Sequence, residues 1–188
     1  MYARPLLALA LCASFASAGP LYAQVAQSDA PSLLVGVRHA DTAQEPAGDR
    51  ALSDAGMKRA QALAAALRNA GVSAIITSQY RRSRDTAQPL ASALGLTPEV
   101  IPISKATIDS HMKQLEAAAR KHKGKVVLVV GHEESVPMLV AALGGPRLPN
   151  ICPSSHSNLY VLAIADGKAQ LVLSRYGAPE KELGPDCK

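Results

Sequence analysis

The sequence is poor in aromatic side chains: its 188 residues include five tyrosines, one phenylalanine and no tryptophan. Proteins that bind single-stranded nucleic acid stack the bases on aromatic rings and present strongly basic faces. The formal net charge of +5 is only mildly basic. We therefore expect no nucleic-acid partner, whereas the charge suits a small anionic ligand.

A membrane-spanning run is also missing at the N-terminus. The apolar segment 5–16 has about 12 residues, against the roughly 20 that a transmembrane helix needs. It follows Arg4 and ends in Ala16-Ser17-Ala18, small residues of the kind that a signal peptidase reads. We expect residues 1–23 to be a signal peptide, cleaved after Ala18 or Ala23. The mature protein is then exported, to the periplasm or the medium, without stable membrane insertion.

Cysteine is scarce as well, and one of the three cysteines, Cys12, lies in the signal segment. The other two, Cys152 and Cys187, are 35 positions apart. In an oxidising compartment an even pair favours a disulfide, which would pin the C-terminal tail with roughly 3–4 kcal/mol in the chain-entropy model. Two free thiols are the alternative. Neither cysteine has a Cys or His partner at ligand spacing, so we expect no metal site.

The remaining chain of about 170 residues has the length of one domain. We expect a polar linker over 24–32 and a single domain over 33–188. Short apolar runs alternate with amphipathic stretches, which predicts an α/β three-layer sandwich, with a mainly parallel central sheet and helices on both faces. Asp166-Gly167 predicts a C-terminal antiparallel hairpin. The predicted strands are 33–37, 74–76, 100–103, 126–130, 158–164 and 169–173; the predicted helices lie between Ser53 (the N-cap) and Gly71, and over 86–94, 108–122 and 136–143.

Three polar clusters follow predicted strands: Arg38-His39, the segment 78–84, and Gly131-His132-Glu133. Because the carboxyl ends of parallel strands meet at one edge of a sheet, we expect these clusters to converge. Arginine forks bind phosphate oxygens bidentately and stay charged. A neutral imidazole can attack phosphorus, while arginines and a second imidazole stabilise the charge on the equatorial oxygens. The clusters therefore predict a phosphoryl-transfer site.

The same residues resemble the motifs of the histidine phosphatase superfamily, also called phosphoglycerate-mutase-like. Val37-Arg38-His39-Ala40 is similar to the first motif, Arg-His-Gly or Arg-His-Ala. Segment 49–56 resembles the Asp-Pro-Pro-Leu-Thr stretch with its following glycine, and segment 77–87 is similar to Ser-Ser-x-x-x-Arg-Ala-x-x-Thr-Ala. Segment 127–132 is similar to Val-Leu-Val-Val-Gly-His. The likeness extends from about Leu33 to Gly177 and indicates a small exported member of bacterial type.

The resemblance implies a role for each matching residue. His39 is the expected nucleophile, which forms a phosphohistidine. Arg38 and Arg82 are the expected phosphate ligands, and His132 is the second imidazole of the pocket. We also expect substrate contacts from Ser78, which is otherwise a simple turn residue, and from Asp41.

The general acid is less well defined. Glu133 directly follows His132, as an acid does in one branch of the superfamily, and is our first choice. Asp109, between the second and last motifs, is the rival, and Asp41 and Glu134 are near enough in sequence to be considered. The other histidines are expected outside the site, His111 and His122 on a solvated helix face and His156 in a loop, with a place of His156 at the border of the pocket as the alternative.

Two other functions stay open: a phosphate-binding module without turnover, and a phosphomutase. Only about 45 residues separate Arg82 from Val127, whereas mutases of the family carry an insertion there, so the sequence favours a small hydrolase. We expect hydrolysis of a small phosphomonoester without a metal or other cofactor. The substrate and the oligomeric state are not indicated.

Overall fold

The computed structural model describes residues 32–103, 107–180 and 187. They form a six-stranded sheet in the order β3-β2-β4-β1-β5-β6, in which β3, β2, β4 and β1 are parallel and β5 and β6 are antiparallel. The fold class expected from the sequence is therefore confirmed. The strands are β1 (Leu33–Arg38), β2 (Val72–Thr77), β3 (Glu99–Val100), β4 (Val126–Gly131), β5 (Asn158–Ala165) and β6 (Lys168–Arg175), and the helices are α1 (Asp54–Leu67), α2 (Arg81–Leu94), α3 (Ile108–Arg120) and α4 (Ser135–Ala142).

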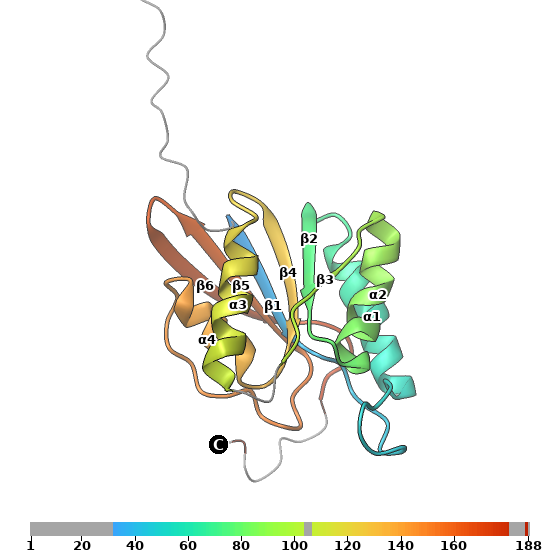
Figure 1. Ribbon diagram of the computed structural model, residues 1–188. Coiled ribbons are helices and arrows are strands. Elements are labelled where there is room, and N and C mark those ends of the chain that lie inside the picture. Colours follow the sequence, from blue (N-terminus) through green and yellow to red (C-terminus); the bar gives the residue numbers. More distant parts are fainter. Residues whose placement is uncertain (1–31, 104–106, 181–186, 188) are drawn as a thin grey trace, which may run out of the picture.

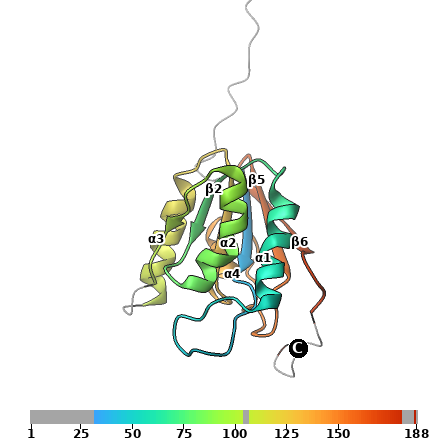
Figure 2. The ribbon, with the colours of Figure 1, turned by 90° about the vertical axis from the view of Figure 1, so that its right-hand side faces the viewer.

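Helices cover both faces of the sheet, with α1 and α2 on one side and α3 and α4 on the other (Figures 1 and 2). Each face has its own apolar core. Leu63 of α1 and Leu90 of α2 pack with Val35 and Val130 on one face. On the other face, side chains of α3 and α4, such as Leu115 and Leu139, pack with strand residues that point the opposite way. This alternation explains why β1 and β4 appear in the sequence as continuous apolar runs.

The start of α1 is fixed by two small residues. Ser53 is the N-cap, as expected, and its Oγ accepts the backbone N–H of Gly56 at 3.1 Å. Gly56 itself lies against the loop that follows β1, because a Cβ at this position would come 2.0 Å from the carbonyl oxygen of Asp41. Glycine at this position thus lets α1 approach the chain two residues beyond His39.

Two predicted boundaries are wrong. Helix α2 begins at Arg81, well before the expected start at Thr86, because the polar run of arginines forms the first helical turn and does not belong to the preceding loop. Strand β3 contains only Glu99 and Val100, whereas 100–103 was expected. Beyond Val100 the backbone N–H of Ile101 still donates to the carbonyl oxygen of Thr77 at 2.8 Å, but Ile103 is held by the Gln79 side chain, which bonds both its N–H and its carbonyl oxygen.

The C-terminal tail is joined to the body of the domain by a disulfide between Cys152 and Cys187, whose Cα atoms are 5.3 Å apart. The expected signal peptide with its cleavage sites after Ala18 or Ala23, and most of the expected linker, lie outside the described residues and stay predictions. Within the described parts of the chain, no helix is both long enough and apolar enough to cross a membrane.

Candidate active site

The three polar clusters converge at the carboxyl ends of β1, β2 and β4. The rings of His39, after β1, and His132, after β4, have centroids 5.4 Å apart. Ser78, directly after β2, contacts His132. Two hollows open at this edge, with volumes of about 360 Å³ and 320 Å³, and His39, Arg38 and Arg82 line both of them. The first hollow is completed by Tyr80, Ile103, Ile108, His111, His132, Glu133, Glu134 and Ser135, and the second by Thr42, Gly48 and Arg50.

His39 is buried and held in one orientation. Its backbone N–H donates to the carbonyl oxygen of Gly131 at 3.0 Å, and its ring Nδ1 lies 2.9 Å from the carbonyl oxygen of Ala40. Because a carbonyl only accepts, Nδ1 carries the proton and Nε2 keeps its lone pair. Burial lowers the pKa of His39 to about 3, with the positive charge of Arg38 adding to the effect, although the bond to Ala40 opposes it. His39 is therefore a neutral imidazole with an unprotonated Nε2 at neutral pH.

His132 is also neutral at that pH, since burial and the nearby charge of Arg82 lower its pKa to about 4. Its Nε2 lies 2.9 Å from Ser78 Oγ, and the Ser78 hydroxyl donates to Ser83 Oγ at 3.1 Å. The hydroxyl proton is thereby used, so this arrangement requires that His132 Nε2–H donates to Ser78. Ser78 orients His132 here, and its expected contact with phosphate stays a prediction.

Arg38 is held by the loop that precedes β5. One terminal nitrogen, Nη1, lies 3.0 Å, 2.6 Å and 3.3 Å from the carbonyl oxygens of Cys152, Pro153 and Ser155. The other, Nη2, pairs with Glu133 Oε2 at 3.5 Å. The buried Nε has no hydrogen-bond partner among the described residues.

Arg82 contributes the second guanidinium and is positioned by an aromatic ring. Its Cζ lies 4.3 Å from the centroid of the Tyr80 ring, a cation–π arrangement. The same ring meets that of His132 edge-on, with centroids 5.7 Å apart. Arg81 and Arg84, by contrast, are exposed.

The candidate acids differ in where they lie. Glu133 and Glu134 line the larger hollow. Asp109 is exposed in the first turn of α3 and is not among the lining residues. The Asp41 carboxylate accepts from Arg59 Nε at 2.7 Å and lines neither hollow. The geometry thus favours the pair after His132 as proton donors, and the substrate contact expected of Asp41 stays a prediction that this ion pair does not favour.

Several residues of the site did not stand out in the sequence. His111 was expected in solvent, which is wrong: it is 2% exposed and lines the larger hollow. The signal was present, because His111, Leu115 and Ala118 share the buried face of α3 at helical spacing. His156 donates from Nδ1 to the carbonyl oxygen of His39 at 2.7 Å, and a lone histidine in a serine-rich loop carries no sign of that contact. Arg50 adds a third guanidinium to the smaller hollow.

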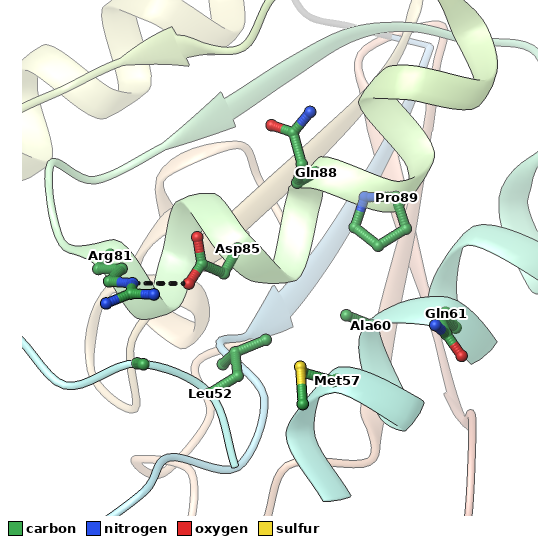
Figure 3. A pocket seen from close by; sticks show the side chains of 9 residues that line it. Leu52, Met57, Ala60, Gln61, Arg81, Asp85, Gln88 and Pro89 are labelled. Carbon is green, nitrogen blue, oxygen red and sulfur yellow. Dashed lines mark hydrogen bonds and ion pairs between the residues drawn. The ribbon is translucent and has the colours of Figure 1, made fainter. Parts of the chain in front are cut away.

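A further pocket, of about 320 Å³, lies between α1 and α2 and is mostly apolar. Figure 3 shows Leu52, Met57 and Pro89 around it, with the Arg81–Asp85 ion pair at its edge. It contains no histidine and none of the phosphate-binding arginines. The histidines and arginines gathered at the sheet edge thus line the two hollows beside His39 and not this pocket.

Comparisons with known proteins bear on the family and on the fold. The family model described as histidine phosphatase superfamily (branch 1) matches residues 34–103, which include Arg38, His39 and Arg82. No curated protein matches the sequence. Among solved structures, the protein histidine phosphatase SixA complexed with tungstate superposes with a TM-score of 0.60 and 21% identity, over 76% of this chain and 96% of that one.

A mycobacterial glucosyl-3-phosphoglycerate phosphatase superposes with a TM-score of 0.56 and 20% identity, over 78% of this chain and 99% of that one. At such identities the likeness establishes the fold, and the family model adds the motifs of the first half of the domain. Residues 34–103 thus match the histidine phosphatase superfamily, as the motifs of that segment had indicated, and the domain is similar in fold to these two phosphatases.

Proposed function

We propose that the protein hydrolyses phosphomonoesters through a phosphohistidine on His39, with guanidinium groups instead of a metal ion around the phosphoryl group. The observation that carries the proposal is the state of His39. Its Nδ1 donates to Ala40 and its pKa is lowered to about 3, mainly by burial, so that Nε2 presents a lone pair between two arginines. A nucleophile prepared in this way needs no base to remove a proton.

In the first half-reaction, His39 Nε2 forms a bond to phosphorus while the bond from phosphorus to the ester oxygen breaks. The guanidinium groups of Arg38 and Arg82, which line both hollows, bind the equatorial oxygens. These donors are fixed before the reaction by the carbonyls around Arg38 and by the Tyr80 ring. Donors positioned in advance stabilise the transition state without a reorganisation cost.

The leaving oxygen needs a proton, and we assign its delivery to Glu133. This carboxyl lines the larger hollow and lies 3.5 Å from Arg38 Nη2, so it is at the edge of the phosphate site. In the second half-reaction the Glu133 carboxylate takes a proton from water, whose oxygen attacks phosphorus. The phosphorus–nitrogen bond breaks, phosphate leaves, and His39 and Glu133 return to their initial states.

The similar proteins support a phosphatase, and the glucosyl-3-phosphoglycerate phosphatase supports a small phosphorylated substrate, whereas SixA is named for a protein substrate. The two described above are named as phosphatases, and the SixA structure holds tungstate, a tetrahedral oxyanion of the kind that the two hollows suit by their arginines. The smaller hollow adds Arg50 to Arg38 and Arg82. Such a cluster of three guanidiniums favours anionic substrates.

The test is release of phosphate from p-nitrophenyl phosphate by the purified mature chain, with a chelator present throughout. We expect turnover by the wild type and its loss in His39→Ala. His122→Ala is the matched control, because this histidine lies at the far end of α3 and lines neither hollow. Equal turnover in wild type and His39→Ala would refute the mechanism. Tight phosphate binding without turnover would instead indicate a binding module.

Export is a second part of the proposal. The signal-like segment supports it, and so does the Cys152–Cys187 disulfide, since structural disulfides persist mainly in oxidising compartments. Fractionation of cells that express the full chain tests it. The processed form is expected in the periplasm or the medium, and an unprocessed cytosolic chain would contradict export.

A further inference from the structure

The loop of residues 152–157, here called the arginine loop, contacts both Arg38 and His39, the proposed phosphate ligand and nucleophile. Three of its carbonyl oxygens, those of Cys152, Pro153 and Ser155, surround Arg38 Nη1. Its His156 donates from Nδ1 to the carbonyl oxygen of His39 at 2.7 Å, and the two rings have centroids 5.6 Å apart. A shift of this loop would therefore move the guanidinium and the backbone of the nucleophile together.

One carboxylate holds the arginine loop in place, and it comes from the C-terminal tail. Oε1 of Glu180 accepts the backbone N–H groups of His156 and Ser157, and Oε2 accepts the Ser155 hydroxyl at 2.8 Å. Ser155 Oγ in turn accepts from Asn158 Nδ2 at 3.0 Å. Three consecutive residues of the loop are thus tied to a single side chain.

The tail that carries Glu180 is itself anchored at two points. Buried Arg59 donates to the carbonyl oxygens of Tyr176 at 3.3 Å and Ala178 at 3.0 Å. Beyond Glu180, the disulfide joins Cys187 to Cys152, the first residue of the arginine loop. Glu180 therefore follows directly after a backbone segment that Arg59 holds.

We propose that Glu180 is a positioning residue, which sets the orientation of Arg38 and His39 through the arginine loop. This inference rests on the proposed function only for the roles of Arg38 as phosphate ligand and His39 as nucleophile. The carboxylate makes no hydrogen bond to either group. Its negative charge favours protonated Arg38 through space, and its positional effect is transmitted by the 155–157 backbone; Glu180→Gln removes the charge and keeps the bonds, and so separates the two. The same contacts could alternatively serve stability alone, and the two roles predict different results.

The decisive variant is Glu180→Ala, which removes all three bonds to the arginine loop. Glu180→Gln is the conservative partner, because its amide oxygen can still accept both backbone N–H groups. Glu116→Ala is the matched control: it removes a carboxylate that accepts from Arg120 at 2.9 Å on α3, far along the chain from the arginine loop.

The first readout is independent of turnover. Heteronuclear NMR of the Arg38 Nε–H and His39 ring signals should show shifts in Glu180→Ala, near-native positions in Glu180→Gln, and no change in Glu116→Ala. The second readout is the kcat for p-nitrophenyl phosphate, expected to fall about 10- to 100-fold in Glu180→Ala, the range typical of a misplaced reacting group, and to be restored largely by Gln.

Unshifted Arg38 and His39 signals in a folded Glu180→Ala protein would overturn the inference, even if the wild type proves to be a phosphatase. Shifted signals in an enzyme without turnover would support the inference while the proposed function fails. If Glu180→Ala does not fold, Ser155→Ala decides, because it removes one of the three bonds and leaves the backbone carbonyl on Arg38. Unshifted signals in that variant would likewise overturn the inference.

Discussion

The ion pair between Asp41 and Arg59 gives a prediction that separates a structural role from a substrate contact. Asp41 lies two residues after the proposed nucleophile His39, yet its Oδ2 is 2.7 Å from Arg59 Nε. The Arg59 side chain is only 6% exposed, so it depends on protein acceptors. We expect Asp41→Ala to destabilise the fold and to leave substrate affinity nearly unchanged.

The magnitude follows from what Arg59 loses. Its Nη1 keeps the carbonyl oxygens of Tyr176 and Ala178, and only the bond from Nε is removed. A hydrogen bond between charged groups contributes about 1.5–3 kcal/mol, and the 29% exposure of the Asp41 side chain lets water replace part of the lost acceptor. We expect a decrease of about 2 kcal/mol in the free energy of unfolding, or about 4–8 °C in Tm for a domain of this size.

The assay combines urea unfolding with the KM for p-nitrophenyl phosphate, measured well below the unfolding transition. Asp85→Ala is the control, because it removes a pair with Arg81 whose two side chains are 40% and 57% exposed, worth about 0.3–0.5 kcal/mol. If Asp41 bound the substrate, its loss in Asp41→Ala would instead raise KM about tenfold for each 1.4 kcal/mol of binding free energy lost. An unchanged unfolding midpoint with a raised KM would refute the structural role.

Three further predictions follow from the site and its support. Gly56→Ala should lower the free energy of unfolding by about 3 kcal/mol, because the added Cβ would come 2.0 Å from the carbonyl oxygen of Asp41. A near-native urea unfolding midpoint would contradict this close approach. Burial lowers the pKa of His39 to about 3 and that of His132 to about 4, so their contribution to stability is full above about pH 6.5 and is lost as pH falls toward those values; NMR titration of either ring near pH 6.5 would contradict it. Glu133→Gln should lower turnover more than Asp109→Asn, and the reverse order would transfer the acid role.

The sequence predicts well those elements of the fold whose signals lie within the element itself, such as apolar runs and helix caps. Continuous apolar runs identified β1 and β4 because these strands are buried on both faces, and Ser53 was identified as the N-cap of α1 by its place before an amphipathic stretch. The start of α2 is missed because the polar segment 81–85 contains no apolar residues whose spacing could indicate a helix. Its position is set by tertiary contacts, such as the bond from the Arg81 N–H to Asp49 Oδ1 at 2.7 Å.

The site shows the same division. Arg38, His39, Arg82 and His132 were found because each follows a strand and matches a motif, and the parallel sheet brings those strand ends together. Contacts between distant segments were not visible: nothing in the sequence connects Glu180 with the 155–157 backbone. The local sequence does not predict these hydrogen bonds, because the partners of Glu180 lie more than 20 residues away and are brought to it only by the fold.

The central claim is that His39 becomes covalently phosphorylated, and a rapid-quench experiment tests it most directly. Wild-type protein is mixed with ³²P-labelled phosphomonoester, quenched in base within a single turnover, and digested for peptide mapping. We predict acid-labile, base-stable label on the peptide that contains His39, with none in His39→Ala and normal labelling in His122→Ala. Turnover without label on His39, or equal turnover in His39→Ala, would contradict the account.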